Sequence, residues 1–194
     1  MGDYHAITTK GGYDFFEVSS AFQKSVRRGL DEEAMYWAVE LSESGFGNYL
    51  WKRIRIISSE DIGLAEPMLH VQIRILYDNW VEQSKEDKKT GKTSNRLFIA
   101  HAVLLLARAK KSRLVDHFNI VHFRTHNEVK KEIPDWALDK HTRRGKKLKR
   151  GFRHFFEEGG RLENENRQPG DDEYLERVMR LLIRPEPGDQ QELF

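Results

Sequence analysis

Residues 51–67 read WKRIRIISSEDIGLAEP, a helical pattern that passes into a short acidic turn and begins again at a proline. Leu50, Ile54 and Ile57 recur at the spacing of one helix face, which predicts that this helix packs against others. Gly63 is suited to a left-handed helix stop, and Pro67 to the first turn of the next helix. The stretch therefore predicts a corner between two packed helices, and a corner alone indicates no function.

Similar patterns predict further helices on both sides of this corner. We expect them over residues 18–28, 31–41, 67–83, 97–107, 112–131 and 174–183, with residues 84–94 as a polar loop. Gly29 is the expected left-handed stop of the first of these helices. The 67–83 helix should turn four residues inward, namely Met68, Val71, Ile75 and Trp80. The 97–107 helix is apolar nearly all round, which is typical of a helix buried in the middle of an array. No alternating stretch is long enough to demand a sheet, so the predicted fold is all-α, an orthogonal array of about six to eight helices.

The predicted organisation has four parts. Residues 1–17 form an arm that docks through Tyr13, Phe15 and Phe16, and residues 18–133 form the helical domain. Residues 134–183 form a basic, glycine-punctuated extension with one short helix packed on that domain, and residues 184–194 form a flexible tail rich in proline and acidic residues.

Composition excludes several classes of protein. The chain has no cysteine, which rules out disulfides and thiolate chemistry and is consistent with the cytoplasm. No apolar run approaches the roughly 18 residues that a membrane helix needs, so we expect no membrane partner. No motif indicates a cofactor.

The net charge of +2 conceals a strong asymmetry. Between residues 140 and 153, eight of fourteen side chains are cationic and none is acidic, whereas residues 157–194 carry a balance of −6. Such a basic segment can neutralise phosphates, with Phe152 and His154 available to stack on bases and Gly145 and Gly151 allowing close backbone approach. The alternative is a solvated face that pairs with the acidic region or with another subunit. The candidate nucleic-acid residues are Lys140, Arg143, Arg144, Lys146, Lys147, Lys149, Arg150 and Arg153.

Four segments together carry a resemblance: SAFQKSVRRG at 20–29, AMYW at 34–37, SSEDIGLAEP at 58–67 and AVLLLARAKKS at 102–112. In order and at compatible spacing, they resemble the C-terminal part of the replication-associated recombination ATPases, AAA+ proteins also called maintenance-of-genome-stability or Werner-helicase-interacting ATPases. The resemblance implies a clamp-loader collar-like helical domain that oligomerises and acts at DNA. Its signature residues here, expected to be structural, are Ser59, Glu60, Asp61, Gly63 and Pro67.

The ATPase module itself is expected to be absent, because only a short arm precedes Ser20. A separate AAA+ ATPase chain is therefore a candidate partner. Gly91-Lys92-Thr93 reproduces the end of a phosphate-binding loop, but Glu86 stands where the motif needs a glycine and a charged loop replaces the preceding strand, so we expect no ATP site.

The last five residues, QQELF at 190–194, resemble the short peptide by which many bacterial replication and repair proteins hold the sliding clamp. Leu193 and Phe194 would fill an apolar pocket, and the Gln190 amide would fix the register. The alternative is a free terminus that happens to end in two apolar residues.

Catalytic residues are harder to find. His117, His122 and His126 lie close in sequence, and the last two share a helix face at a spacing that can ligate zinc, but no HExxH pattern is present. Glu60 and Asp61 are expected to cap the next turn or to pair with Arg53 or Arg55. The sequence therefore favours a non-catalytic DNA replication or repair accessory protein that oligomerises and binds DNA and the sliding clamp. The alternative is a metal-dependent enzyme that acts on nucleic acid through the histidines.

Overall fold

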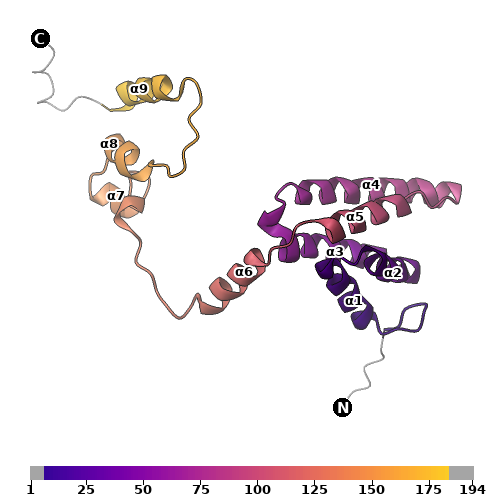
Figure 1. Cartoon of the computed structure of the whole chain (residues 1–194). Coiled ribbons are helices and arrows are strands. Elements are labelled where there is room, and N and C mark those ends of the chain that lie inside the picture. The colour runs from indigo at the N-terminus through magenta and orange to yellow at the C-terminus, as the bar shows by residue number, and fades with distance from the viewer. Residues whose placement is uncertain (1–6, 184–194) are drawn as a thin grey trace, which may run out of the picture. The chain divides into compact units, whose positions relative to one another are not determined.

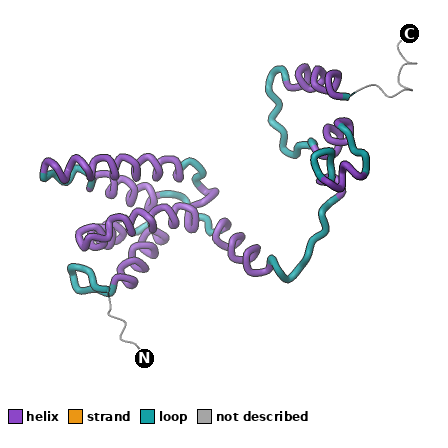
Figure 2. Tube along the Cα trace, turned by 180° about the vertical axis from the view of Figure 1, so that it is seen from behind, coloured by secondary structure: helices purple, strands orange, loops and turns teal. Residues whose placement is uncertain are grey.

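The computed structural model describes residues 7–183, and this range consists of helices joined by turns and loops (Figures 1 and 2). The only β-pairing in this part of the chain is one antiparallel bridge between Thr8 and Asp14. The all-α prediction is therefore confirmed. The chain divides between Glu128 and Val129 into two compact units, which are described separately below.

Unit 1 is a helical array joined by tight turns. Asp14 begins the first helix by accepting hydrogen bonds from the Phe16 and Glu17 amides, and Gly29 ends it in the predicted left-handed conformation, with φ 73°. The helices of the unit are α1 (Phe15–Arg28), α2 (Asp31–Leu41), α3 (Gly47–Ile57), α4 (Leu69–Thr90), α5 (Arg96–Arg108) and α6 (Leu114–Thr125), and its short turns are η1 (Ser42–Phe46), η2 (Ser58–Ile62) and η3 (Gly63–Ala65).

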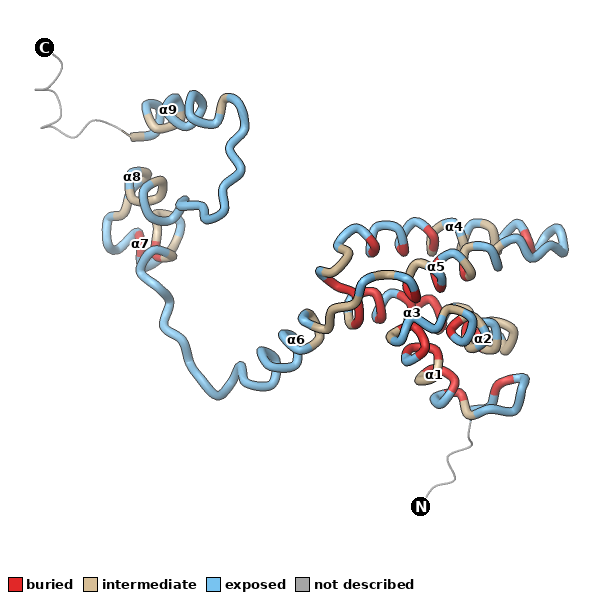
Figure 3. Tube along the Cα trace, in the orientation of Figure 1, coloured by how far each residue is buried: buried red, intermediate tan, exposed pale blue. Residues whose placement is uncertain are grey.

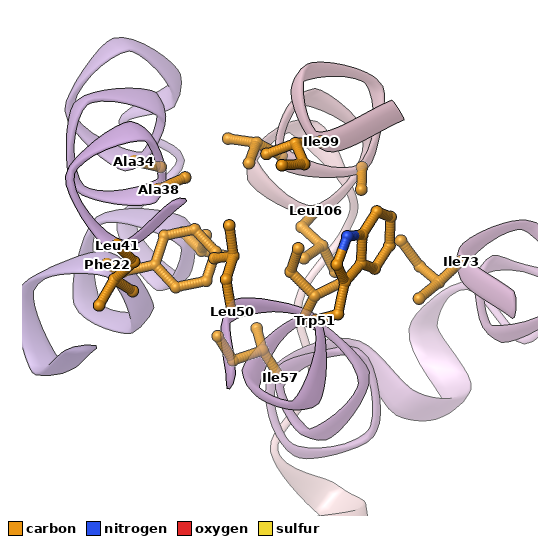
Figure 4. Close-up of a cluster of buried hydrophobic side chains, with 14 of the residues drawn as sticks. Phe22, Ala34, Ala38, Leu41, Leu50, Trp51, Ile57, Ile73, Ile99 and Leu106 are labelled. Carbon is orange, nitrogen blue, oxygen red and sulfur yellow. The ribbon is translucent and has the colours of Figure 1, made fainter. Parts of the chain in front are cut away.

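The core of unit 1 is organised around α3, which carries the first half of the 51–67 stretch. Leu50, Ile54 and Ile57 are fully buried, as their spacing predicts, and Trp51 is fully buried as well. Figure 3 shows the buried positions along α3. In Figure 4 the side chains of α3 lie between those of α1 and α2 on one side and those of α4 and α5 on the other, with the Trp51 ring turned toward Ile73. Each such large side chain contributes about 1.5–3 kcal/mol by leaving water, so α3 is the element that holds the array together.

The N-terminal arm docks partly as expected. The Tyr13 ring lies edge-on to Trp37, with centroids 5.4 Å apart, and Phe15 is buried. Phe16, by contrast, is exposed, because it lies on the outer face of α1.

Two predictions about α4 are wrong. The residues that it buries are Leu69, Ile73 and Leu76, whereas Met68, Val71 and Ile75 are exposed and Trp80 is half-buried. Apolar residues lie on two sides of this helix, so periodicity could not select the face that Trp51 and α5 cover. The helix also continues through the predicted loop to Thr90, because most residues of 84–90 are good helix formers.

The predictions for α5 and α6 also need correction. The outer face of α5 is not covered, since Leu97 is 70% exposed and Leu104 is 40% exposed. The helix α6 ends at Thr125 rather than near Lys131, and none of its residues is buried.

Unit 2 has short elements and a small core. Its described elements are η4 (Asp135–Ala137), α7 (Arg143–Lys147), α8 (Phe152–His154), η5 (Phe155–Gly159) and α9 (Asp171–Leu182). Leu138 is the only large apolar side chain that the structure shows as buried within residues 129–183. Polar contacts must therefore carry much of the stability of this unit.

Candidate nucleic-acid interface

The predicted basic segment folds around α7, which begins at a threonine cap. The Thr142 hydroxyl accepts a hydrogen bond from the Gly145 amide at 2.9 Å and donates one to the Asp139 carbonyl oxygen at 3.0 Å. The helix is a single turn, so this cap fixes most of its geometry.

Gly145 has a packing role that differs from the predicted one. A Cβ atom at this position would lie 1.8 Å from the Asp139 carbonyl oxygen, and the residue is buried. The glycine therefore lets α7 pack directly on the preceding backbone, and it does not present a backbone surface to a phosphate chain. Gly151 has open space around it.

Among the eight predicted cations, Arg150 forms hydrogen bonds inside the unit. Arg150 donates hydrogen bonds to the Asp135 carboxylate at 2.6 and 2.7 Å and to the Leu138 carbonyl oxygen at 2.8 Å. The hydrogen bonds from Arg150 also lower the pKa of Asp135 below its ordinary value of 3.8. Leu138 supplies most of the small core of this unit. Arg150 bonds to its carbonyl oxygen and to Asp135, so it stabilises the backbone against which α7 packs.

The predicted stacking residues are less open than the sequence suggested. The Lys140 ammonium lies 3.6 Å from the centroid of the Phe152 ring, so one face of that ring already holds a cation. His154 is half-buried, and its Nδ1 has no partner within residues 7–183. The neighbouring His141 donates a hydrogen bond from Nδ1 to the Asp139 carboxylate at 2.9 Å, and this contact lowers the pKa of Asp139.

The remaining cations of the segment are exposed. Arg143, Lys146, Lys147 and Lys149 form no ion pair with any residue of the described 7–183 range, and Arg144 acts on Asp135 only as a nearby charge. Arg153 is exposed too and has an interaction of its own. The structure thus brings together a cluster of uncompensated positive charges on one small, polar-stabilised unit.

The signature residues occupy a different place, the corner of unit 1. Asp61 is fully buried and accepts hydrogen bonds from Arg27 Nε at 2.6 Å and Gln23 Nε2 at 3.1 Å. Glu60 pairs with Arg27 Nη2 at 3.1 Å, and Arg113 lies 3.8 Å from both carboxylates. The predicted pairing with an arginine is therefore confirmed, but the partners are Arg27 and Arg113 rather than Arg53 or Arg55. These contacts, led by the hydrogen bond that Arg27 donates to Asp61, raise the pKa of Arg27 above its ordinary value.

Sequence reasoning missed Gln23, Arg27 and Arg113 as partners of the acidic turn. Two of the three lie inside the 20–29 segment that carries the family resemblance, so that segment held the signal. Arg53 instead contacts Gln23 Oε1, which joins α3 to the same network.

The other signature residues shape the corner. Gly63 has φ 49° and ψ −121°, which lies outside the left-handed helical region that we predicted, and a Cβ there would lie 2.8 Å from Val115 Cγ2. Pro67 precedes α4 by two residues rather than forming its first turn. Ser59 is exposed in η2, just after α3. The backbone of Asp61 also accepts a hydrogen bond from the Ser112 amide at 2.9 Å, which fixes the start of α6.

Three sequence candidates add no site to the described structure. Gln190, Leu193 and Phe194 lie outside the described residues.

The residues from 7 to 183 contain no group of three His, Asp or Glu side chains that could hold a metal ion, and the His122 ring lies 4.1 Å from that of Phe118. Gly91 ends α4 in the left-handed conformation, at the helix end whose dipole repels phosphate. No helix in the described range is long and apolar enough to cross a membrane.

Comparison with known proteins places the chain in a family. A family model described as the C-terminal part of MgsA AAA+ ATPases matches residues 30–177. Replication-associated recombination protein A of Haemophilus influenzae is 29% identical over 144 residues, and its namesake from Coxiella burnetii is 31% identical over 144 residues. These matches cover 74% and 73% of this chain but only 30% and 31% of the relatives, so the chain spans about a third of their length. A shorter match, 43% over 61 residues, is to an ATPase called WRNIP1 from Dictyostelium discoideum.

The family match begins just after the 20–29 segment, and it takes in the other three segments that carried the resemblance. It continues to residue 177, so it includes the acidic turn and the basic segment. The chain therefore belongs to the family of MgsA AAA+ ATPase C-terminal domains.

Proposed function

We propose that this chain is a non-catalytic accessory module of DNA replication or repair that binds nucleic acid through the exposed cations of residues 140–153. The observation that supports this most directly is the cluster of uncompensated positive charges around α7. Replication-associated recombination is the context named for its relatives.

The binding would be electrostatic and non-specific. Exposed lysine and arginine side chains neutralise phosphates and release counterions, whereas base recognition needs side chains held in a groove of the nucleic acid. The face around α7 offers long, solvated cations on a one-turn helix, which suits the first mode of binding. With Arg150 used inside the unit, we expect the contacts to come from Arg143, Arg144, Lys146, Lys147 and Lys149.

A matched pair of variants tests this proposal. The first replaces Arg143, Arg144, Lys146 and Lys147 with glutamine, and the second removes four exposed cations of unit 1, Lys24, Lys85, Lys88 and Lys92, in the same way. Fluorescence anisotropy with labelled single-stranded and duplex DNA should show at least about tenfold weaker binding for the first variant only. Equal losses in both variants would show that total charge, rather than this face, governs binding.

The C-terminal peptide supports a second contact, with the sliding clamp. A glutamine followed three residues later by Leu-Phe, after a proline-rich acidic run, suits a tethered anchor that fills an apolar pocket. Replacing Leu193 and Phe194 with alanine should abolish binding to the purified clamp in a calorimetric titration, whereas replacing Glu186 and Asp189 should leave most of it. Unchanged affinity in the Leu193/Phe194 variant would remove the clamp from the proposal.

We also propose that the chain assembles with further copies of itself and with an AAA+ ATPase. The helix α6 supports self-assembly, because Phe118, Val121 and Phe123 are all more than half exposed on a helix with no buried residue. A short helix with so much uncovered apolar surface is marginal in water by itself. Light scattering should show a species larger than a monomer, and replacing Phe118 and Phe123 with serine should shift it toward the monomer.

A further inference from the structure

Besides the basic segment of residues 140–153, unit 1 has a groove between α3 and α6 that could receive a ligand. It is open to solvent and encloses about 650 Å³. One wall is the outer face of α3, with Lys52, Arg55 and Ile56, and the other is the first half of α6, with Val115 and Asn119. The acidic turn η2 closes the corner between the two walls.

The acidic side chains of this groove are already neutralised. Glu60 pairs with Arg27 at 3.1 Å, and the Asp116 carboxylate contacts the Arg113 guanidinium. Neither carboxylate therefore offers a free negative charge to a ligand.

The basic side chains are not neutralised in the same way. Lys52 forms no ion pair within residues 7–183, and the Arg55 guanidinium lies over the Tyr77 ring, 4.7 Å from its centroid. Aromatic stacking orients a guanidinium but leaves its charge and its edge N–H groups available. The uncompensated charge of the groove is positive, and it comes from these two residues.

The surface between the charged groups can bind an apolar side chain and a peptide backbone. Ile56 is 38% exposed and lies against the groove together with the half-buried Val115. The Ser59 hydroxyl and the Asn119 amide line the groove and have no hydrogen-bond partner in the described part of the chain. Both can donate and accept hydrogen bonds, as a peptide backbone requires.

The groove is also pre-formed. The α3 wall is anchored by the fully buried Trp51 and Ile54, and the start of α6 is fixed by the hydrogen bond from the Ser112 amide to the Asp61 carbonyl oxygen. Gly63 permits Val115 to lie closer to the turn than a larger residue would allow. A ligand would therefore lose little affinity in ordering the site.

We propose that this groove binds a short segment of a partner protein that carries carboxylates beside an apolar side chain. The carboxylates would pair with Lys52 and Arg55, and the apolar side chain would lie on Ile56 and Val115. A nucleic-acid strand fits less well. Arg55 covers the Tyr77 ring, so that ring is not open for a base to stack on it. The groove also offers only Lys52 and Arg55 to phosphates, which would lie near the carboxylates of Glu60 and Asp116. The signature residue Ser59 forms no side-chain hydrogen bond within residues 7–183, and in this proposal its hydroxyl contacts the peptide backbone.

The experiment selects ligands from a random library of displayed dodecapeptides on the immobilised full chain. Selected peptides are then titrated against three proteins: the natural chain, Lys52→Ala/Arg55→Ala, and the control Lys85→Ala/Lys88→Ala, which removes the same charge elsewhere on unit 1. We expect the selected peptides to contain an acidic residue within two positions of a leucine, isoleucine or phenylalanine. Their Kd should rise about fivefold to thirtyfold in the Lys52/Arg55 variant and stay within about twofold in the control.

Three outcomes would overturn the proposal. The first is the absence of any enriched peptide, and the second is enrichment of neutral or basic sequences. The third is equal binding to the Lys52/Arg55 variant and the natural chain. Single-stranded DNA is titrated in parallel, and if the Lys52/Arg55 variant loses DNA affinity but no peptide affinity, the groove belongs to a nucleic-acid surface instead. Ile56→Ser supplies an independent check, since it should weaken the same peptides without changing the charge of the groove.

Discussion

Removal of Arg27 should destabilise unit 1 because it leaves a buried carboxylate without its main partner. Asp61 is fully buried, and Arg27 gives it the shortest contact, at 2.6 Å. Breaking a buried pair by removing one member costs about 3–5 kcal/mol. Two features reduce that figure: Arg27 itself is 31% exposed, and Arg113 lies 3.8 Å from the same carboxylate. We therefore expect Arg27→Met to lower the free energy of unfolding by about 2–3 kcal/mol.

Urea unfolding followed by tryptophan fluorescence, to which the buried Trp51 contributes, measures this loss. With a slope of about 2 kcal/mol per molar urea, the midpoint should fall by about 1–1.5 M. Arg28→Met is the matched control, because Arg28 is exposed and its one side-chain hydrogen bond within residues 7–183 is to the Lys24 carbonyl oxygen. Its midpoint should stay within about 0.3 M of the natural value.

The double variant Arg27→Met/Asp61→Asn separates the lost contact from the orphaned charge. It should be more stable than Arg27→Met alone, because an asparagine needs no counter-charge and can still bond to Gln23. If Arg27→Met costs no more than the control, or if the double variant is the less stable of the two, the buried-charge reasoning is wrong.

Three further predictions concern other parts of the fold. Gly63→Ala should lower the free energy of unfolding by about 2–3 kcal/mol, because the residue has a φ of 49° and its Cβ would lie 2.8 Å from Val115. Gly91→Ala should lower it by about 1 kcal/mol, because Gly91 has a φ of 71° but open space around it. Thermal unfolding compares the two variants. Gly145→Ala should cost about 3 kcal/mol and raise hydrogen exchange across residues 134–160 by mass spectrometry, because its Cβ would overlap the Asp139 carbonyl. Because the pKa of Asp135 is lowered in the fold, its carboxylate stabilises the protein at pH values above its ordinary pKa of 3.8, and this contribution is lost as the pH falls through the folded pKa. Asp135→Asn should therefore make the free energy of unfolding fall less steeply between about pH 5 and pH 2. An unchanged pH dependence would contradict the role of Arg150.

Local patterns predicted the helices of unit 1 well where one face was clearly apolar. The buried face of α3 and the glycine stop of α1 follow from spacing and backbone conformation, which act over a few residues. The face and the length of α4 did not follow, because Met68, Val71 and Ile75 form a second apolar stripe, and the partners that choose between the stripes are remote in sequence.

The acidic corner shows the same limit for polar contacts. The sequence predicted an arginine partner for Glu60 and Asp61 and offered those of the preceding helix, whereas the partner Arg27 lies more than thirty residues away. Long-range pairing depends on tertiary packing, which spacing cannot supply. The family resemblance located the corner as a unit, and the structure then identified what holds it.

For the basic segment, charge density located the cluster but could not assign the individual cations. Arg150 binds Asp135, and Lys140 lies over the Phe152 ring. Gly145 allows α7 to pack on the Asp139 backbone. Those assignments depend on the folded backbone, since each joins residues from different turns of unit 2.

The most direct test of the proposed nucleic-acid interface is the salt dependence of DNA binding. The logarithm of the observed association constant, plotted against the logarithm of salt concentration, has a slope of about −0.7 for each phosphate neutralised on a single strand. Replacing Arg143, Arg144, Lys146 and Lys147 with glutamine should therefore make the slope shallower by about 2–3, while the four-lysine control in unit 1 leaves it unchanged. An identical slope for the natural chain and the α7 variant would contradict the account.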